Sequence, residues 1–354
     1  MQRFGTAAIV MVVSIFVLWW IIWTIGAVQY RRFIDNWIEA HRALGYQVTY
    51  DNRDTEGFPH YITLHFGNFV LINPDGIRIH ANDVSLAAFP WHWRNFNAKL
   101  KHGFELVIPF TNDKTLLIST DAIARNHTEL EENGDWKFMD LELTDAKALW
   151  GQEPFFGARK FEIALERPDI APQDHTQPGL TITGSADNLS LPPGLDAPFG
   201  PQAAKIETSL RVMGPVPDPR LKTSVTAWNT SGGVVEFDRF FLQWGSLIFS
   251  AKGTLGLDDD EQPEGVFSSQ IGNHKEVLKT LLAAGYIPKH DAGMLDSALN
   301  LFAKHSTIEG KPGIDVPITV QLGGLFLGPV HIFAFPEIAW ELDQPPAAAP
   351  LPAH

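Results

Sequence analysis

Histidines and carboxylates are the residues of this sequence whose types could bind a metal ion or transfer protons. Among the thirteen histidines, two pairs stand close along the chain: His60 with His65, and His92 with His102. Either pair could ligate a metal only if the fold brought further ligands to it. In the alternating run around position 65, His65 falls on the face opposite Leu64. We therefore predict solvated histidines and no metal site.

The acidic run at residues 258–261 (Asp-Asp-Asp-Glu) has the composition of a calcium-binding loop without its pattern. An EF-hand loop spaces its ligands and carries a glycine at its sharp turn, and this run does neither. It lies between the strand-like segment 254–257 and Gly265. We predict a solvated hairpin turn, and an adventitious Ca²⁺ site is the alternative.

Motifs of the common enzyme classes are missing from the sequence. It contains no nucleophile elbow, no phosphate-binding P-loop, no dinucleotide-binding glycine pattern and no zinc-protease helix motif. A Ser-His-Asp triad is close in space and not in sequence, so a hydrolase stays an alternative. The glycosylation sequons at Asn126 and Asn229 carry little information about function. We expect a non-enzymatic protein with no catalytic residues, no metal and no cofactor.

The overall composition limits the partners of the chain. Its 354 residues include 27 Lys and Arg against 41 Asp and Glu, for a net charge of −14. This excess argues against nucleic acid, which requires a basic face, and against attraction to anionic lipid by charge alone. The sequence has no cysteine, which excludes disulfides and thiolate metal sites. A cysteine-free chain also fits an oxidising compartment.

An uncharged apolar run near the N-terminus predicts a membrane anchor. Residues 7–28 contain no charged side chain, and a helix of this length spans about 33 Å at 1.5 Å per residue. That length matches a hydrocarbon core about 30 Å thick. A buried core helix is the structural alternative. The run exceeds the roughly 7–15 apolar residues of a cleaved signal peptide, and residues 25–27 (Ile-Gly-Ala) match a cleavage site poorly.

Two features of the sequence give opposing predictions of the orientation of this anchor. Arg3 precedes the apolar run, whereas Arg31, Arg32 and Arg42 follow it, and positive-inside counting would place the long C-terminal part in the cytoplasm. Long domains, however, cross the membrane largely regardless of flanking charge. The acidic composition and the missing cysteines favour the outside face, the local charge count favours the cytoplasm, and these residues alone leave the orientation open.

Residues 29–44 predict a short amphipathic linker helix. Apolar side chains recur at spacings of three and four, including Phe33, Ile34, Trp37 and Ile38. Gly45 is a natural helix end. We expect this apolar stripe to pack on the following sheet, with a partner-binding helix as the alternative.

After Gly45 the hydrophobic period falls from about 3.6 to 2, which is typical of half-buried strands. Turn signals at residues 73–76 and at Asn82-Asp83 separate short alternating runs, so we expect tight antiparallel connections. The predicted runs are 61–66, 77–80, 84–88, 96–101, 136–138, 141–143, 161–163, 206–212, two within 237–257, and others within 318–335.

The rest of the chain suggests one large soluble domain at residues 45–341. The segment 168–198 is rich in Pro and Gly and marks either a long loop or a sub-boundary, and 273–304 is a broken helical interval. Residues 1–6 form a short N-terminal segment, and the Pro/Ala-rich residues 342–354 are expected to be a disordered tail. The predicted fold class is α+β and β-dominated: a transmembrane helix, then a large, curved, mostly antiparallel sheet with a few helices.

Several segments resemble an uncharacterised bacterial envelope family, domain of unknown function 2125. They are Gly57-Phe58-Pro59 after Gly45-Tyr46, Ala88-Phe89-Pro90-Trp91, Trp244-Gly245 with residues 253–258 and 263–265, and residues 317–329 with Pro336. The resemblance implies an anchor in the bacterial inner membrane and a domain in the periplasm, and it supplies no catalytic residues. The chain is also distantly similar to AsmA-like envelope proteins, which is an analogy of fold.

These features favour a protein that holds or guides an apolar ligand such as a lipid. A sheet with a strongly apolar face needs helices, a second sheet or a ligand to cover it, and the helical interval is short for so many strands. The alternative is a structural or assembly factor that binds another envelope protein through a sheet edge.

Overall fold

The computed structural model describes residues 2–111, 114–193, 197–217, 222–286, 293, 305–327, 330–335 and 337–338. The chain forms two compact units, and each is described by itself. Unit 1 comprises Met1–Pro109 and Leu116–Leu143, and unit 2 comprises Phe110–Thr115 and Thr144–Pro345.

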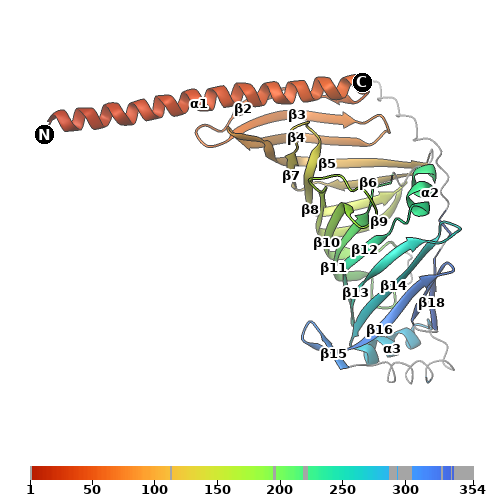
Figure 1. Cartoon of the computed structure of the whole chain (residues 1–354). Helices are drawn as coiled ribbons and strands as arrows, with labels where there is room; N and C mark the ends of the chain where they lie inside the picture. Colours follow the sequence, from red (N-terminus) through yellow and green to blue (C-terminus); the bar gives the residue numbers. More distant parts are fainter. Residues whose placement is uncertain are drawn as a thin grey trace. The chain divides into compact units, whose positions relative to one another are not determined.

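A single long helix, α1 (Gln2–Ala43), begins unit 1. The predicted anchor and the predicted linker helix, 7–28 and 29–44, lie on this one helix without a break between them. Its side chains at residues 11–22 are mostly exposed, with Val12 66% and Ile15 57% accessible, whereas Tyr30 is fully buried. The helix ends where expected, and Gly45 takes a φ of 91°. Figure 1 shows α1 lying along β3 and β4 and extending beyond them at its N-terminal end.

The second half of α1 packs on one side of a small antiparallel sheet in unit 1. Ile34 and Ile38 of the amphipathic stripe are buried, as the sequence predicted, and the helix contacts β3. Gly26 allows this close approach, because a Cβ at that position would lie 2.9 Å from Cβ of Pro90 and 3.3 Å from Cδ1 of Ile62. The glycine therefore fixes how closely the helix lies against the sheet.

Unit 1 builds this sheet from antiparallel pairs. β3 pairs with β1, β2 and β4, and the pairing continues through β5 and β7 to β8. Ile62, Leu64 and Phe66 alternate inward along β3, as the period of 2 predicts. The strands that lie wholly or partly in unit 1 are β1 (Gln47–Thr49), β2 (Arg53–Glu56), β3 (Ile62–Ile72), β4 (Arg78–Phe89), β5 (His92–Thr111), β6 (Lys114–Thr120), β7 (Ala124–Leu130) and β8 (Trp136–Trp150).

One predicted turn in unit 1 is wrong. Asn82-Asp83 does not separate two strands but lies inside β4, where the register with β5 shifts between Ala81 and Asp83. The Asn82 side-chain amide donates to the His102 carbonyl across this irregularity. A β-bulge absorbs an extra residue without ending the strand, so polar residues that favour turns also occur there.

Unit 2 continues with antiparallel strands. Each strand from β9 to β14 pairs with the next, β14 pairs with β16, and β16 pairs with β15 and β17. The strands are β9 (Glu153–Glu166), β10 (Pro178–Ser190), β11 (Gln202–Met213), β12 (Val235–Trp244), β13 (Leu247–Leu257), β14 (Pro263–Gly272), β15 (His305–Ile308), β16 (Lys311–Gln321), β17 (Gly324–Leu327) and β18 (Val330–Ala334).

Two short helices accompany these strands in the described part of unit 2: α2 (Lys222–Thr230) and α3 (His274–Ala283). The helix α3 confirms the first part of the predicted helical interval, while most of residues 287–304 and the predicted tail 342–354 lie outside the described residues. The Pro/Gly-rich segment 168–198 lies within unit 2, where it contains a loop and β10. The chain is thus β-dominated and antiparallel with a long apolar N-terminal helix, as predicted.

Candidate functional site

The strands of unit 2 align their apolar side chains in cross-strand rows on one face. One row follows the register from β9 to β12, where Leu165 faces Ile182, Ile182 faces Leu210, and Leu210 faces Phe237. Successive side chains of a strand point to opposite faces, so aligned apolar positions build a continuous surface. Each of these four side chains is half-buried and not sealed in a core.

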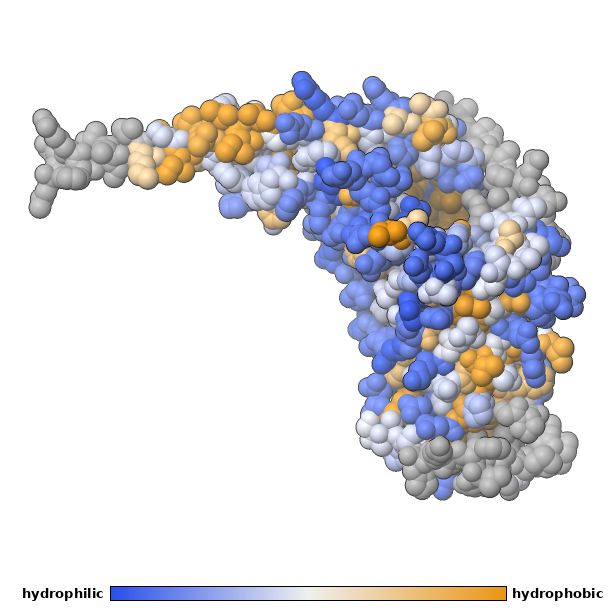
Figure 2. Space-filling model, in the orientation of Figure 1, coloured by the Kyte–Doolittle hydropathy of each residue, from blue (hydrophilic) through white to orange (hydrophobic). Residues whose placement is uncertain are grey.

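The apolar surface extends over six strands. We call this surface the apolar face. In Figure 2, orange residues interrupt the blue surface of unit 2 in the region where Figure 1 labels β13 and β14. Large contiguous apolar surfaces of this kind mark binding sites more often than ordinary solvent-exposed surface. The half-buried members are Phe161, Ile163, Leu165, Leu180, Ile182, Ile206, Leu210, Val212, Phe237, Phe240, Leu242, Phe249, Leu255, Phe267 and Ile271.

Aromatic pairs stiffen the middle of the apolar face. The rings of Phe237 and Phe267 meet edge to face with centroids 5.6 Å apart, and those of Phe240 and Phe249 do so at 6.0 Å. Edge-to-face pairs at such distances are favourable and have a defined geometry. The face therefore offers a structured apolar surface.

The opposite face of the same strands is mainly polar, with charged pairs on β9, β11 and β12 and a small buried apolar cluster where β12 and β13 meet β15. Lys160 approaches Glu162 to 2.5 Å on β9, and Lys205 approaches Glu207 to 2.5 Å on β11. The hydrogen bond from Lys205 holds the pKa of Glu207 below its ordinary value, and Arg239 of β12, 3.0 Å away, adds to this shift. Lys160 lowers the pKa of Glu162 in the same way. This face carries its own polar pairing and suits contact with water.

The short helix α3 packs at one end of the apolar face. Leu278, Leu281 and Leu282 of α3 pack with Ile271 against the buried side chains Ile314 and Val316 of β16. At another place in unit 2, Trp228 of α2 is buried and donates its indole N–H to the Met213 carbonyl at 2.9 Å. Away from α3, the apolar face keeps partly exposed side chains, which a ligand could cover.

The structure does not bring the predicted histidine pairs together as ligands. His60 and His92 are exposed, and His65 lies 3.0 Å from the Ser85 hydroxyl and 3.6 Å from a Glu56 oxygen. His102 lies at the β-bulge with a φ of 60°. Across the described residues, no group of three His, Cys, Asp or Glu side chains could hold a metal ion.

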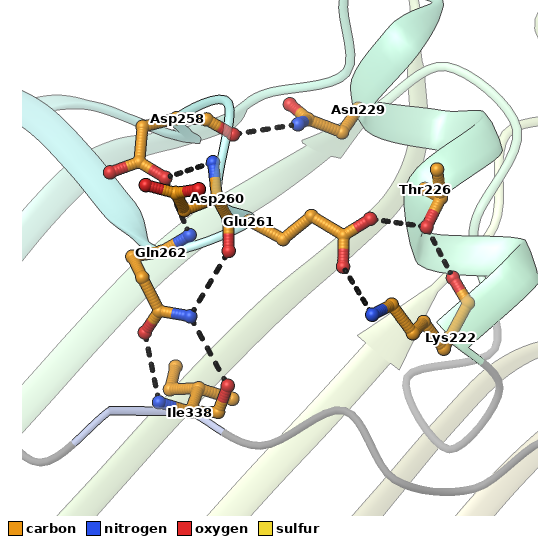
Figure 3. Close-up of polar contacts among 8 residues, drawn as sticks. All are labelled: Lys222, Thr226, Asn229, Asp258, Asp260, Glu261, Gln262 and Ile338. Atoms are coloured by element: carbon orange, nitrogen blue, oxygen red, sulfur yellow. Dashed lines mark hydrogen bonds and ion pairs between the residues drawn. The ribbon is translucent and has the colours of Figure 1, made fainter.

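The acidic run at 258–261 forms the hairpin turn between β13 and β14, as predicted. Its first carboxylate accepts the backbone N–H groups of Asp260 and Gln262 at 2.9 and 2.8 Å. Glu261 accepts a hydrogen bond from Thr226 of α2, and the Gln262 side chain bonds both backbone groups of Ile338 (Figure 3). The acidic run therefore has a structural role, because it forms a turn whose hydrogen bonds hold α2 and residue 338 against the hairpin.

The asparagine side chains of the two sequons make hydrogen bonds within the fold. The Asn126 side chain donates to the Asp140 carbonyl and accepts from Thr128, and the Asn229 amide donates to the Asp258 carbonyl at 3.2 Å. Both side chains join neighbouring elements through these hydrogen bonds.

Sequence reasoning missed a group of aromatic residues at the edge of unit 1. In the sequence, the motifs around Phe58 and around Phe89-Pro90-Trp91 indicate only a resemblance to a family. In the structure the turn after β2 and the turn between β4 and β5 both contact α1. Exposed aromatic residues beside proline, in two turns, were the available signal.

The helix α1 is the second feature with functional meaning. Within the described residues, it is the one helix long and apolar enough to cross a membrane. Figure 2 shows the hydrophobic band that follows this helix where it leaves the sheet. Length and composition are therefore compatible with membrane anchoring.

Comparison with known proteins assigns the chain to a family. The family described as "Uncharacterized protein conserved in bacteria" matches residues 23–336, which is most of the chain. No curated protein matches the sequence. The similarity to AsmA-like envelope proteins stays a prediction. The span of the family match shows that the chain belongs to this bacterial family of uncharacterised proteins, DUF2125.

Proposed function

We propose that this protein is a non-enzymatic envelope protein, anchored in the bacterial inner membrane by α1, whose unit 2 lies in the periplasm and binds an apolar ligand such as a lipid acyl chain. The observation that carries the proposal is the apolar face, where partly exposed apolar side chains continue across six strands while the reverse face carries charged pairs on β9 and β11. An acyl chain laid on such a face removes apolar surface from water on both partners.

Neighbouring residues of β10 provide a matched test of ligand binding. Ile182 belongs to the apolar face, whereas the next residue, exposed Thr183, points to the opposite, mainly polar face. We expect Ile182→Glu to lower the affinity for a fluorescent fatty acid at least about tenfold, which corresponds to about 1.4 kcal/mol, because the carboxylate would lose water against an acyl chain. Titration of the detergent-extracted full chain measures this affinity.

The control variant is Thr183→Glu, which adds the same charge to the same strand and should bind the probe like the parent chain. Native mass spectrometry of gently extracted protein adds a second readout, in which co-purified lipid should be seen on the parent and be depleted on Ile182→Glu. A ligand-free parent that takes up no probe would overturn the lipid proposal. Cellular crosslinking that traps one dominant protein would instead favour the assembly-factor alternative.

The periplasmic location has a separate test. An alkaline phosphatase fused after residue 341 should be active, because this enzyme folds in the periplasm and long domains are exported in spite of Arg31 and Arg32. A fluorescent protein that matures only in the cytoplasm, fused at the same junction, should stay dark. An inactive phosphatase fusion together with a fluorescent reporter fusion would contradict the periplasmic location. The ligand proposal is tested separately by the Ile182→Glu variant.

A further inference from the structure

Two turns of unit 1 carry exposed aromatic side chains beside the apolar helix. The turn between β2 and β3 contributes Phe58 and Tyr61, which are 37% and 46% exposed. The turn between β4 and β5 contributes Phe89 and Trp91, which are 39% and 54% exposed. We call these four residues the aromatic tip. Large exposed aromatics are unusual for a surface that faces water only, and they are typical of membrane–water interfaces.

The aromatic tip packs directly on the apolar part of α1. The Phe58 ring meets Phe16 edge to face at 5.7 Å and Trp23 at 5.6 Å. The rings of Trp19 and Trp91 lie 5.8 Å apart. All three helix residues fall within the uncharged run, so the tip lies alongside residues expected in the bilayer and not beyond them.

Two hydrogen bonds from indole groups of α1 also join the tip to this helix. The indole N–H of Trp19 donates to the Pro59 carbonyl at 2.9 Å, and that of Trp23 donates to the Tyr61 carbonyl at 2.9 Å. Within the turn, the Tyr61 N–H donates to the Gly57 carbonyl at 3.1 Å. Unpaired polar groups are costly in hydrocarbon, so these bonds remove a penalty that would otherwise oppose insertion of the turn.

Helix length decides how deep the tip lies. Arg3 is the last charged residue before the apolar run. A hydrocarbon core about 30 Å thick corresponds to about 20 residues at 1.5 Å each, which places its far boundary near Trp23. The stretch of α1 from Arg3 to the first ring contact at Phe16 covers only about 20 Å of this thickness. The remaining part of the core coincides with the helix segment that carries the aromatic tip.

We infer that the aromatic tip inserts into the lipid leaflet on the domain's side of the membrane, so that unit 1 is held at the bilayer by its turns as well as by α1. This inference rests on the proposed anchoring by α1. Arg31 and Arg32 follow Trp23 within three turns of helix, where long basic side chains can extend towards lipid phosphates. The occupant of this surface is the lipid bilayer itself.

The cysteine-free sequence allows single labels to measure depth. We would place an environment-sensitive NBD label at Tyr61→Cys and at Trp91→Cys, which each replace one tip residue. A third label at the exposed neighbour His92→Cys keeps all four tip residues. The full chain is reconstituted in vesicles of phosphatidylethanolamine and phosphatidylglycerol that contain nitroxide-labelled lipids. Nitroxides near the head groups should quench all three labels at least about twofold more than a label held in water.

Two control positions separate the possible failures. Leu44→Cys lies just past the C-terminal end of α1 in the same unit, 68% exposed and about 30 Å along the helix from Trp23, and its label should not be quenched. Ile15→Cys lies on the free part of α1, and deep nitroxides should quench its label. Quenching at Ile15 without quenching at the tip positions would overturn the inserted tip and keep the anchor. No quenching at Ile15 would show that the anchoring itself is wrong.

Discussion

The double variant Val12→Lys and Ile15→Lys is expected to abolish stable membrane insertion of the chain. Both side chains are more than half exposed on the free part of α1, so the change leaves the described contacts of unit 1 intact. A lysine at the centre of a membrane helix costs about 2.5–3.5 kcal/mol, and two cost about 5–7 kcal/mol. The measurement is the fraction of full-length protein that stays in the membrane pellet after a carbonate wash.

The matched control replaces the same residues with leucine, which keeps the helix apolar and should remain in the pellet. The aromatic tip alone should not resist carbonate, because interfacial side chains bind reversibly and a spanning helix does not. If the lysine variant remained in the pellet as firmly as the parent, α1 would not be the anchor. The proposed location and the inserted tip would then both fall.

The second large effect is expected in the core of unit 1, where Leu64→Ala should lower local stability by about 2–5 kcal/mol. The Leu64 side chain is fully buried on β3 and faces Leu86 across the pair with β4. Its truncation leaves a cavity beneath α1 that the close-packed strands cannot fill completely. Amide hydrogen exchange of β3 and β4, measured on the detergent-solubilised chain, gives the free energy of opening for this unit.

The control is Lys99→Ala on β5, an exposed residue of the same sheet, for which a change within about 0.5 kcal/mol is expected. Exchange in the strands of unit 2 serves as an internal reference, since Leu64 belongs to unit 1. A loss no greater than that of Lys99→Ala would contradict the assignment of Leu64 to the core.

The aromatic tip and the apolar face suggest two different roles for apolar surface in one chain. The tip is small, aromatic and bonded to α1, which suits permanent contact with lipid head groups and the outer part of the acyl chains. The apolar face is aliphatic and phenylalanine-rich and lies opposite a mainly polar face, which suits a ligand that arrives and leaves. Variants at Trp91 and at Ile182 should therefore change different measurements: label depth in the first case and ligand affinity in the second.

Some contacts that shape the candidate sites could not be predicted from sequence because they join distant residues. Trp19 and Pro59 are 40 positions apart, and their hydrogen bond depends on how α1 lies on β3. The apolar face depends equally on register, since Ile182 meets Leu165 and Leu210 only when three strands pair in this alignment. A shift of one residue would turn these side chains to the mainly polar face.

The sequence by itself determined the apolar helix, the strand-rich antiparallel architecture, the turn at 258–261 and the end of the helix at Gly45, because each depends on local periodicity or backbone preference. The tertiary structure alone decided that α1 runs unbroken from Gln2 to Ala43 and that Asn82 forms a bulge and not a turn. It also decided which apolar side chains stay partly exposed. Packing against distant strands sets these features, and a local pattern carries no information about what lies across the sheet.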